Sequence, residues 1–570
     1  MFEGWILTFA GIDAVRFVTT AALKKMPQSI ALQSTAQWPL LTVGGKARYS
    51  VPREQCRTMT LRRSLSTILL GVLSVRATAL GREVSPNVSL GVPVEVTSAR
   101  RDFRAMLLGL AIVIAAVPSL VRAQAVDIDD AKIREFVTAA MRADAVPGLA
   151  VVVVTRDGTV YAEGFGTTGS DGETITPDTP FVLGSMSKSI TALAVMQLVE
   201  AGRIELGAPV RLYLPDFVMA TAAAQDITIG QLLAHTSGIP TKAARADGDE
   251  STLADQVAAL RNVSLEREPG SAHEYSSPNY QVLGRIVEVV SGDPFGSYVA
   301  EYIFAPLGMR HSYVDADAAR TAGLAQGHQM MFGVAVAREL PAEPGRLPTA
   351  ALMSSANDLG RFMRAQLRGG ELDGARVASE SSVAAMHQPL FQIEGFGYAM
   401  GWRVSDIGVA RAVHHGGIVP NYRGKMVMLP ELGIGVAVLT NVSSVIGSPT
   451  SHRIADGVAA IASGQDPAPS PRWPLRWILM AAAIGVLLIT TLQLRGLVKA
   501  ARAPRSLGAA AREIGFVVVL LLGLPWFVGF GWTQMWRQAP DMTLWIVVAA
   551  VLGLATGLLR LRGNSADLHE

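Results

Sequence analysis

The sequence is short of cysteine, lysine and net charge. Cys56 is the only cysteine among 570 residues, which rules out an intrachain disulfide and a cysteine-based metal cluster. Only eight residues are lysine, the formal net charge is +3, and no basic run is interleaved with aromatic residues. The composition therefore argues against redox chemistry and against nucleic acid as a partner.

Apolar residues, by contrast, are abundant. They make up 50% of the chain, and the mean hydropathy is +0.32. A purely soluble protein is less apolar than this, and a chain of this length has room for roughly two to four domains. We therefore expect membrane segments beside at least one globular domain.

The first part of the chain carries one recognisable signal. Residues 1–105 show no sustained helical or strand period, and no fold is assigned to them. Three arginines precede an apolar run that starts at Met106, and Ala123-Gln124-Ala125 follows it. Residues 106–125 thus have the three parts of a secretory signal peptide with an Ala-x-Ala cleavage site. Export is expected.

The position of this signal leaves two interpretations open. Signal peptides act at the N-terminus, so one interpretation is that translation starts near Met106. The other is a true extension that turns the apolar run into an uncleaved anchor. Sequencing the N-terminus of the native protein separates them, because a mature start near Val126 supports the first and an intact Met1 excludes it.

Residues 126–463 have the patterning of a globular domain. A β-branched run at residues 149–155 and a second run at residues 159–165 flank Asp157-Gly158. An Asp-Gly pair between two strand-like runs favours a tight hairpin turn. The domain is therefore predicted to begin with a β-hairpin.

Helices and further strands are predicted later in the same domain. Apolar residues at helical spacing indicate helices at residues 189–201 and 281–290, and late strands are predicted at residues 424–428 and 435–439. Because helices separate the early strands from the late ones, we predict an α+β domain whose sheet joins both ends of the segment.

The C-terminal part is predicted to be a membrane anchor. A proline-rich linker at residues 464–476 leads into a membrane region at residues 477–560 and a tail at residues 561–570. Three apolar stretches are each long enough to cross a bilayer at about 1.5 Å per residue. They are residues 477–494, 514–536 and 542–559.

The charges between these stretches predict the orientation of the chain. The connection between the first two stretches carries Arg495, Lys499, Arg502, Arg505 and Arg512, whereas the next connection carries only Arg537. By the positive-inside rule the first connection and the C-terminal tail are cytoplasmic. The globular domain is then extracytoplasmic, either periplasmic or extracellular, in a multi-pass protein of the cell membrane.

Ser185 and Lys188 suggest the chemistry of the globular domain. They stand three residues apart at the start of a predicted helix, so one turn brings the hydroxyl and the amine to the same face. An amine in a partly desolvated pocket loses its proton more easily, and it can then take the proton of an attacking serine. Ser185 is therefore a candidate nucleophile, although a bare Ser-x-x-Lys pattern also occurs by chance.

Two later segments could complete such a site. A Ser-Lys pair also needs a proton relay to the leaving group and two backbone donors for the oxyanion. Tyr275 precedes a predicted helix, and a phenol beside an ammonium group can act as a base. The segment from His414 to Gly417 reads His-His-Gly-Gly and lies just before a strand, where glycines let the backbone approach a ligand closely.

The order of these three motifs resembles the serine β-lactamase and penicillin-binding protein superfamily. The resemblance is strongest to the branch that contains class C β-lactamases, D-alanyl-D-alanine carboxypeptidases and related esterases. It extends to segments such as Leu232-Leu233-Ala234-His235-Thr236-Ser237-Gly238 and Leu352-Met353-Ser354-Ser355-Ala356. The resemblance implies a β-lactamase/transpeptidase-like domain with an antiparallel sheet flanked by helices and a helical subdomain.

The same resemblance implies a role for each candidate residue. Ser185 would be acylated, Lys188 and Tyr275 would share the acid and base duties, and His415 would take the basic position of the third motif. The amides of Ser185 and Ile418 would form the oxyanion hole, with Gly417 and Ser277 at the substrate. His235 appears in a segment that is structural in this branch. Neither a metal nor a cofactor is implied.

One departure from the family pattern bears on the substrate. The branch usually has asparagine at the third position of the tyrosine motif, where this chain has Ser277. Serine offers only a short hydroxyl in place of an amide. The sequence thus predicts an exported, membrane-anchored serine hydrolase of an amide or ester, with a β-lactamase, a D,D-carboxypeptidase and a non-catalytic sensor or binding module as alternatives.

Overall fold

A computed structural model describes most of the chain after residue 127. The described residues are 128–169, 172–243, 250–339, 343–444, 450–469, 473–525 and 531–562. The chain divides into two compact units, Met1–Gln124 and Ala125–Glu570, and the described residues all belong to the second. The predicted extension at residues 1–105 and the predicted signal peptide at residues 106–125 lie outside the described residues.

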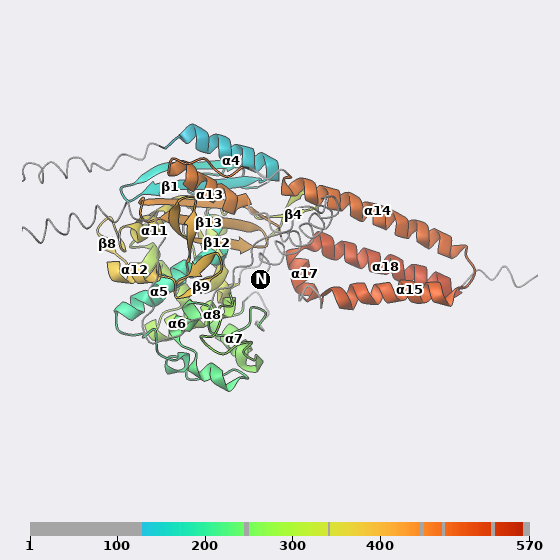
Figure 1. The fold of residues 1–570 in the computed structure, drawn as a ribbon, viewed down its shortest axis with the longest axis horizontal. Helices are drawn as coiled ribbons and strands as arrows, with labels where there is room; N and C mark the ends of the chain where they lie inside the picture. The colour runs from blue at the N-terminus through green and yellow to red at the C-terminus, as the bar shows by residue number, and fades with distance from the viewer. Residues whose placement is uncertain are drawn as a thin grey trace, which may run out of the picture. The chain divides into compact units, whose positions relative to one another are not determined.

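An eight-stranded antiparallel sheet forms the centre of the domain (Figure 1). The predicted hairpin is confirmed, since β1 pairs with β2 in antiparallel register. β1 also pairs with β14, with Val152 opposite Ala437, so the sheet joins both ends of the segment as predicted. In spatial order the strands are β2 (Thr159–Gly166), β1 (Gly148–Thr155), β14 (Ile434–Thr440), β13 (Tyr422–Leu429), β12 (Ala410–Val419), β11 (Arg403–Ile407), β10 (Phe396–Tyr398) and β9 (Phe391–Ile393).

Helices cover both faces of this sheet, which explains the uninterrupted valines of β1. Val151 and Val153 pack in one core with α4 (Asp130–Asp144) and α13 (Thr450–Ala462). Val152 and Val154 point to the opposite core, which contains α11 (Ala356–Leu367) and α5 (Ser187–Glu200). Successive residues of a strand alternate between its faces, so a strand that is buried on both sides is apolar throughout.

A helical subdomain adjoins the sheet and carries the second predicted motif. The helices predicted at residues 189–201 and 281–290 are α5 and α8, and each begins earlier than predicted. Their first turns contain polar residues that give no periodic apolar signal. α8 spans Ser277–Ser291. Further α-helices of the domain are α6 (Ile229–Leu233), α7 (Leu253–Ala258), α9 (Phe295–Val299), α10 (Ala316–Thr321) and α12 (Glu380–Met386).

Short strands complete the domain. β3 (Phe181–Val182) pairs with β6 (Met353–Ser354) just before the nucleophile turn. β4 (His328–Met331), β5 (Val334–Ala337) and β15 (Val442–Ser443) form a three-stranded sheet, and β7 (Glu371–Leu372) pairs with β8 (Ala375–Arg376).

The C-terminal region contains two helices that are long and apolar enough to cross a membrane, whereas three spans were predicted. They are Arg476–Ala501, within α14 (Leu475–Ala501), and α18 (Pro540–Arg562). Only these two qualify among the described residues, and the prediction of three is wrong on that count. The middle stretch consists of α15 (Leu507–Val518), a π-helical segment at Val519–Gly523 and α17 (Trp532–Gln538), and residues 526–530 between them are outside the described residues.

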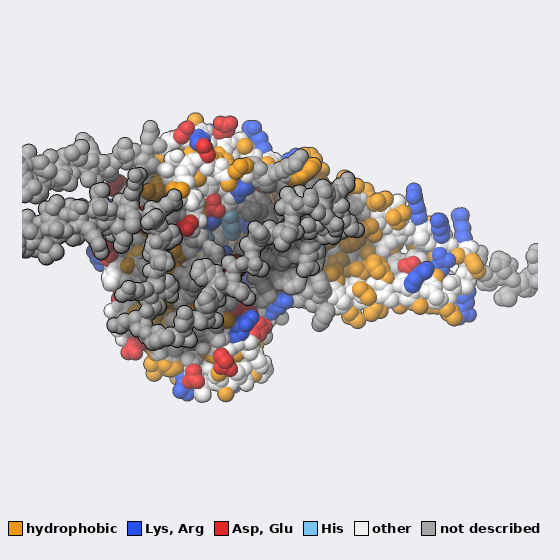
Figure 2. Space-filling model, viewed as in Figure 1, with side chains coloured by type: hydrophobic (Ala, Val, Ile, Leu, Met, Phe, Trp, Pro, Cys, Tyr) orange, Lys and Arg blue, Asp and Glu red, His pale blue; other side chains and the backbone are white. Residues whose placement is uncertain are grey.

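Apolar and charged side chains lie at different places along these helices. Large apolar side chains on α14 and α18 are exposed, among them Ile484, Leu487 and Val551. Figure 2 shows apolar side chains along the helical region and Lys and Arg side chains gathered at its tip. An uncovered apolar surface of this kind is typical of a segment whose solvent is lipid.

The other end of the helical region contacts the domain. Arg537, at the end of α17, pairs with Glu343 at 2.8 Å, and its carbonyl accepts a hydrogen bond from Gln329 Nε2 at 2.7 Å. The amide of Phe332 donates to Asp541 Oδ2 at 2.9 Å, near the start of α18. These contacts fix the β4–β5 hairpin against the ends of α17 and α18.

Candidate active site

Ser185 lies in a tight helical turn between β3 and α5. Gly184 precedes it with a φ of +57°, in the left-handed region that disfavours a side chain. A Cβ at Gly184 would lie 2.5 Å from the amide nitrogen of Ile418, and a Cβ at Gly417 would lie 1.8 Å from the carbonyl oxygen of Leu183. Two glycines therefore let the nucleophile turn and β12 approach each other at backbone distance.

Lys188 is fully buried directly beside the hydroxyl of Ser185. Its Nζ lies 3.3 Å from Ser185 Oγ and donates to the carbonyl oxygen of Thr349 at 2.9 Å. The first turn of α5 thus brings the amine and the hydroxyl together, as the spacing of three residues predicts. The carbonyl of Thr349 is a second hydrogen-bond partner of the amine, and no motif in the sequence indicates it.

Tyr275 closes the site from the helical subdomain. The centroid of its ring lies 5.0 Å from Lys188 Nζ and 5.8 Å from the guanidinium carbon of Arg403. Ser277 is half-buried and is the first residue of α8, two residues after the tyrosine. The second motif therefore meets the first, and Arg403 of β11 adds a cation that no sequence motif indicated.

The two adjacent histidines of the third motif differ in their partners. His415 lies with its ring centroid 6.2 Å from that of Tyr275, and its Nε2 lies 3.3 Å from the hydroxyl of Tyr398. His414 instead has its Nε2 2.9 Å from Ser405 Oγ. Because neighbouring residues of a strand face opposite sides of the sheet, His415 and not His414 faces Tyr275 and Lys188.

Both ring nitrogens of His415 bond to protein groups. Nδ1 lies 2.7 Å from the carbonyl oxygen of Gly416, and only 2% of the residue is exposed. Burial, Arg403 and Lys188 lower the pKa of His415 well below its ordinary value of 6.5. The imidazole is therefore neutral at pH 7, and the role expected for it in the third motif stays a prediction.

His235, which the sequence placed in a structural segment, lies directly under the site. It adopts a φ of +57°, is fully buried, and stacks with its centroid 4.3 Å from that of Tyr275. Its Nδ1 faces the amide of Ser276 at 3.2 Å and the side-chain nitrogen of Asn279 at 3.0 Å. Desolvation lowers its pKa well below 6.5, with Lys188 as the next cause.

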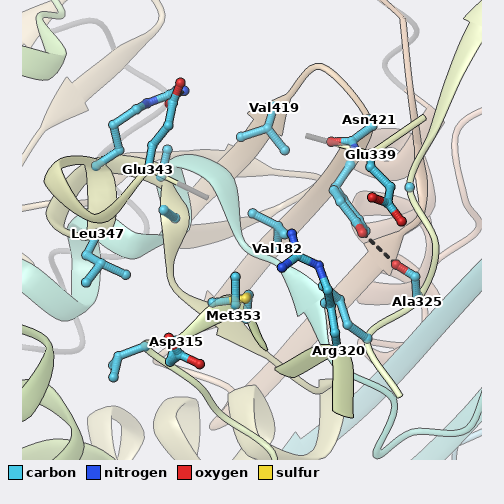
Figure 3. Close-up of a pocket in the computed structure, with 18 of the residues that line it drawn as sticks. Val182, Asp315, Arg320, Ala325, Glu339, Glu343, Leu347, Met353, Val419 and Asn421 are labelled. Atoms are coloured by element: carbon cyan, nitrogen blue, oxygen red, sulfur yellow. Dashed lines mark hydrogen bonds and ion pairs between the residues drawn. The ribbon is translucent and has the colours of Figure 1, made fainter. Parts of the chain in front are cut away.

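A cavity of about 250 Å³ lies in the part of the domain that contains β3 and the end of β12, and Ser185 is not among the residues that line it (Figure 3). Its lining includes Val182, three residues before Ser185, and Val419, directly after Ile418. Figure 3 shows the side chain of Arg320 reaching toward Val182 near its centre, with Glu339 and Glu343 farther around the wall. The lining of the cavity thus contains both apolar and charged side chains. No group of three potential metal ligands occurs among the described residues.

Comparison with known proteins agrees with this architecture. Residues 133–460, more than half of the chain, match the family described as Beta-lactamase. The chain therefore belongs to the β-lactamase family, which includes penicillin-binding protein homologues. Members of this family are typically serine hydrolases that act on small-molecule or peptide substrates.

Particular relatives are similar over this same domain. Penicillin-binding protein 4 of Amycolatopsis lactamdurans is 34% identical over 314 residues, which are 52% of this chain and 81% of that protein. The protein Flp of Staphylococcus aureus is 27% identical over 52% of this chain, and the match spans 60% of Flp, less than two thirds of its length. The structure of the octameric penicillin-binding protein homologue from Pyrococcus abyssi matches with a TM-score of 0.53 and 29% identity, over 60% of this chain and 78% of that one.

Proposed function

We propose that the protein is a serine hydrolase that cleaves an amide or ester through an acyl-enzyme at Ser185. The observation that carries this proposal is the distance of 3.3 Å between Lys188 Nζ and Ser185 Oγ, in a site that the backbone of Ile418 borders. Activation of a weak nucleophile needs a base within hydrogen-bond reach, and this pair meets that condition.

Acylation follows from the positions of these groups. Ser185 Oγ attacks the substrate carbonyl carbon while its proton passes to unprotonated Lys188 Nζ. The carbonyl oxygen becomes an oxyanion, and the amides of Ser185 and Ile418 stabilise it. When the tetrahedral intermediate collapses, the bond to the leaving group breaks, and Tyr275 passes a proton to the departing nitrogen or oxygen and regains one from Lys188.

Deacylation uses the same groups in reverse. A water molecule attacks the acyl carbon, its proton passes to the base, and the bond to Ser185 Oγ breaks as the serine regains a proton. Arg403, beside the ring of Tyr275, favours negative charge on the phenol during these transfers. The cavity next to Val182 and Val419 is where we place the acyl part of the substrate.

We also propose that the domain is exported and held at the outer face of the cell membrane. The arginine-rich connection lies at the far end of α14, whereas Arg537 and Asp541 contact the domain. If the arginines are cytoplasmic, as the positive-inside rule predicts, then the contacted end and the domain are extracytoplasmic.

Active-site labelling tests the proposed reaction. Purified full-length protein is treated with a fluorophosphonate and with a fluorescent penicillin, and the adduct is located by mass spectrometry. We expect a covalent adduct on Ser185 and none in Ser185→Ala. A folded protein that reacts with no acylating probe supports a non-catalytic sensor or binding module, and an adduct that survives the substitution contradicts the assignment of the nucleophile.

Turnover separates a true β-lactamase or D,D-carboxypeptidase from an esterase. Ser277 supplies only a hydroxyl where the branch usually has an amide, so we expect faster turnover of small p-nitrophenyl esters than of a chromogenic cephalosporin or a D-alanyl-D-alanine peptide. Faster turnover of either of the last two would favour the corresponding alternative.

A further inference from the structure

Three buried side chains connect the second motif of the site to the third. His235 Nε2 lies 3.1 Å from the hydroxyl of Tyr398, and the same hydroxyl lies 3.3 Å from His415 Nε2. His235 and Tyr398 are fully buried, and His415 is 2% exposed. Water therefore cannot replace a partner that is lost from this series, and each bond has to be satisfied within the protein.

The backbone groups at the two ends of this series determine which atom donates in each of its hydrogen bonds. The amide of Ser276 can only donate, so His235 Nδ1 accepts and the ring proton lies on Nε2. At the other end the carbonyl of Gly416 can only accept, so His415 Nδ1 carries a proton. His235 Nε2 then donates to the oxygen of Tyr398, whose hydroxyl donates to His415 Nε2.

Each end of the series is hydrogen-bonded to a backbone group that is adjacent in sequence to residues of the candidate site. Ser276 stands between Tyr275 and Ser277, at the N-terminus of α8. Gly416 stands before Gly417 and Ile418, on β12. Tyr275, the candidate proton donor, directly precedes α8. Through Tyr398 of β10, the start of α8 is thereby connected to β12, the strand that carries the amide of Ile418.

We propose that Tyr398 and His235 are positioning residues. They hold His415 in its Nδ1–H tautomer and keep Tyr275 at a fixed position relative to the amide of Ile418. This proposal rests on the proposed hydrolase function. In it His415 is a neutral, structural part of the site, and the nearby positive charge comes from Arg403 and, once it has taken the proton of Ser185, from Lys188. A second proton on His415 would point a donor at the Tyr398 hydroxyl, which would then have to accept from both histidines and turn its own proton away from His415.

The groups that face His415 come from several elements. They are Lys188 of α5, Tyr275 before α8, Tyr398 of β10, Arg403 of β11 and His452 of α13. Arg403 is a cation, Lys188 becomes one when it accepts a proton, and none of the groups is a carboxylate, so the surroundings as well as the hydrogen bonds disfavour a protonated His415.

Nuclear magnetic resonance of the full-length protein with 15N-labelled histidine tests the tautomers. We expect His235 to carry its proton on Nε2 and His415 on Nδ1, in the absence of any substrate. The reverse tautomer at either histidine, or a protonated His415 at pH 7, would overturn the proposal. This readout does not depend on activity, so a protein that no probe acylates can still show the series.

The variant Tyr398→Phe removes only the bridging hydroxyl. We expect a mixed tautomer at His415, a rate of Ser185 acylation that falls about 10- to 100-fold at saturating probe, and an acid limb of the pH–rate profile that moves to higher pH. Tyr161→Phe is the matched control, because that buried tyrosine on β2 also loses a hydroxyl bond, to Glu163, far along the sheet. Unchanged tautomers and rate in Tyr398→Phe would overturn the positioning role, and if that variant does not fold, the tautomers of the unsubstituted protein decide.

Discussion

At the scale of single residues, the burial of Lys188 is the most informative feature of the protein. A lysine on a solvent-facing helix surface is common, but a lysine with no exposed area is rare unless its amine has partners. Here those partners are Ser185 Oγ and the carbonyl of Thr349, with the ring of Tyr275 close by. A buried amine with these partners is suited to the proton transfer that we propose for Lys188.

The variant Lys188→Met tests this placement. Methionine fills a similar volume without the amine, so folding should be retained while acylation of Ser185 slows about 10²–10⁴-fold, the usual contribution of a general base. The rate of adduct formation with the fluorophosphonate measures the effect, and near-ultraviolet circular dichroism checks the fold. A folded variant that is acylated at the original rate would show that another group takes the proton.

At the scale of elements, the close approach between the nucleophile turn and β12 shapes the site. Gly184 and Gly417 permit it, and no other residue type fits the distances. Since Ser185 follows Gly184 and Ile418 follows Gly417, the same contact brings together the two amides proposed for the oxyanion hole. Packing of backbone on backbone thus prepares the site before a substrate arrives.

The variant Gly184→Ala is expected to harm both stability and activity. Its Cβ would adopt a disfavoured φ and press on the amide of Ile418, so we expect a lower melting temperature and slower acylation. Gly202→Ala is a matched control, because Gly202 also has a positive φ, +67°, but its Cβ would meet no atom within 4 Å. That control should lose about 1 kcal/mol of stability while its acylation rate stays unchanged. Equal rates for the two variants would contradict the proposed role of the contact.

At the scale of the whole molecule, buried histidines make folding sensitive to acid. Burial lowers the pKa of His273 and His387 from 6.5 to about 4, and that of His452 to about 3. The pKa values of His235, His414 and His415 are lowered as well. Below pH 6.5 the unfolded chain therefore binds protons that the folded chain does not.

The sign of this effect gives a prediction for stability. The free energy of unfolding should be insensitive to these groups above about pH 7 and should fall as pH drops from 6.5 toward 4, by up to about 1.4 kcal/mol per pH unit for each histidine. Urea unfolding of the domain signal in detergent, at a series of pH values, measures it. His387→Gln should reduce the slope by about one proton, and a slope that is the same in both proteins would show that His387 titrates normally when folded.

The sequence by itself determined the fold class, the early hairpin, its sheet with the late strands, and the first motif. These predictions depend on local patterns, namely β-branched runs, an Asp-Gly turn and a spacing of one helical turn. Such patterns can be recognised without knowing which distant residues lie nearby in the fold. The number of spans was overestimated because a hydropathy window measures apolar content alone, whereas α15 has only 12 residues and α17 only 7.

Only the tertiary structure decided which residues surround the nucleophile. Tyr398, Arg403 and Thr349 lie in segments without any motif. They reach the site because β11 and β10 follow β12 in the sheet, and because the segment Leu347–Ala351 packs against α5 and α8. The resemblance had already favoured His415, and the structure turns His415 toward Tyr275 and His414 toward Ser405, since a strand sends neighbouring side chains to opposite faces. Local pattern fixes what each segment becomes, whereas the meeting of distant side chains depends on strand register and packing, which no single segment encodes.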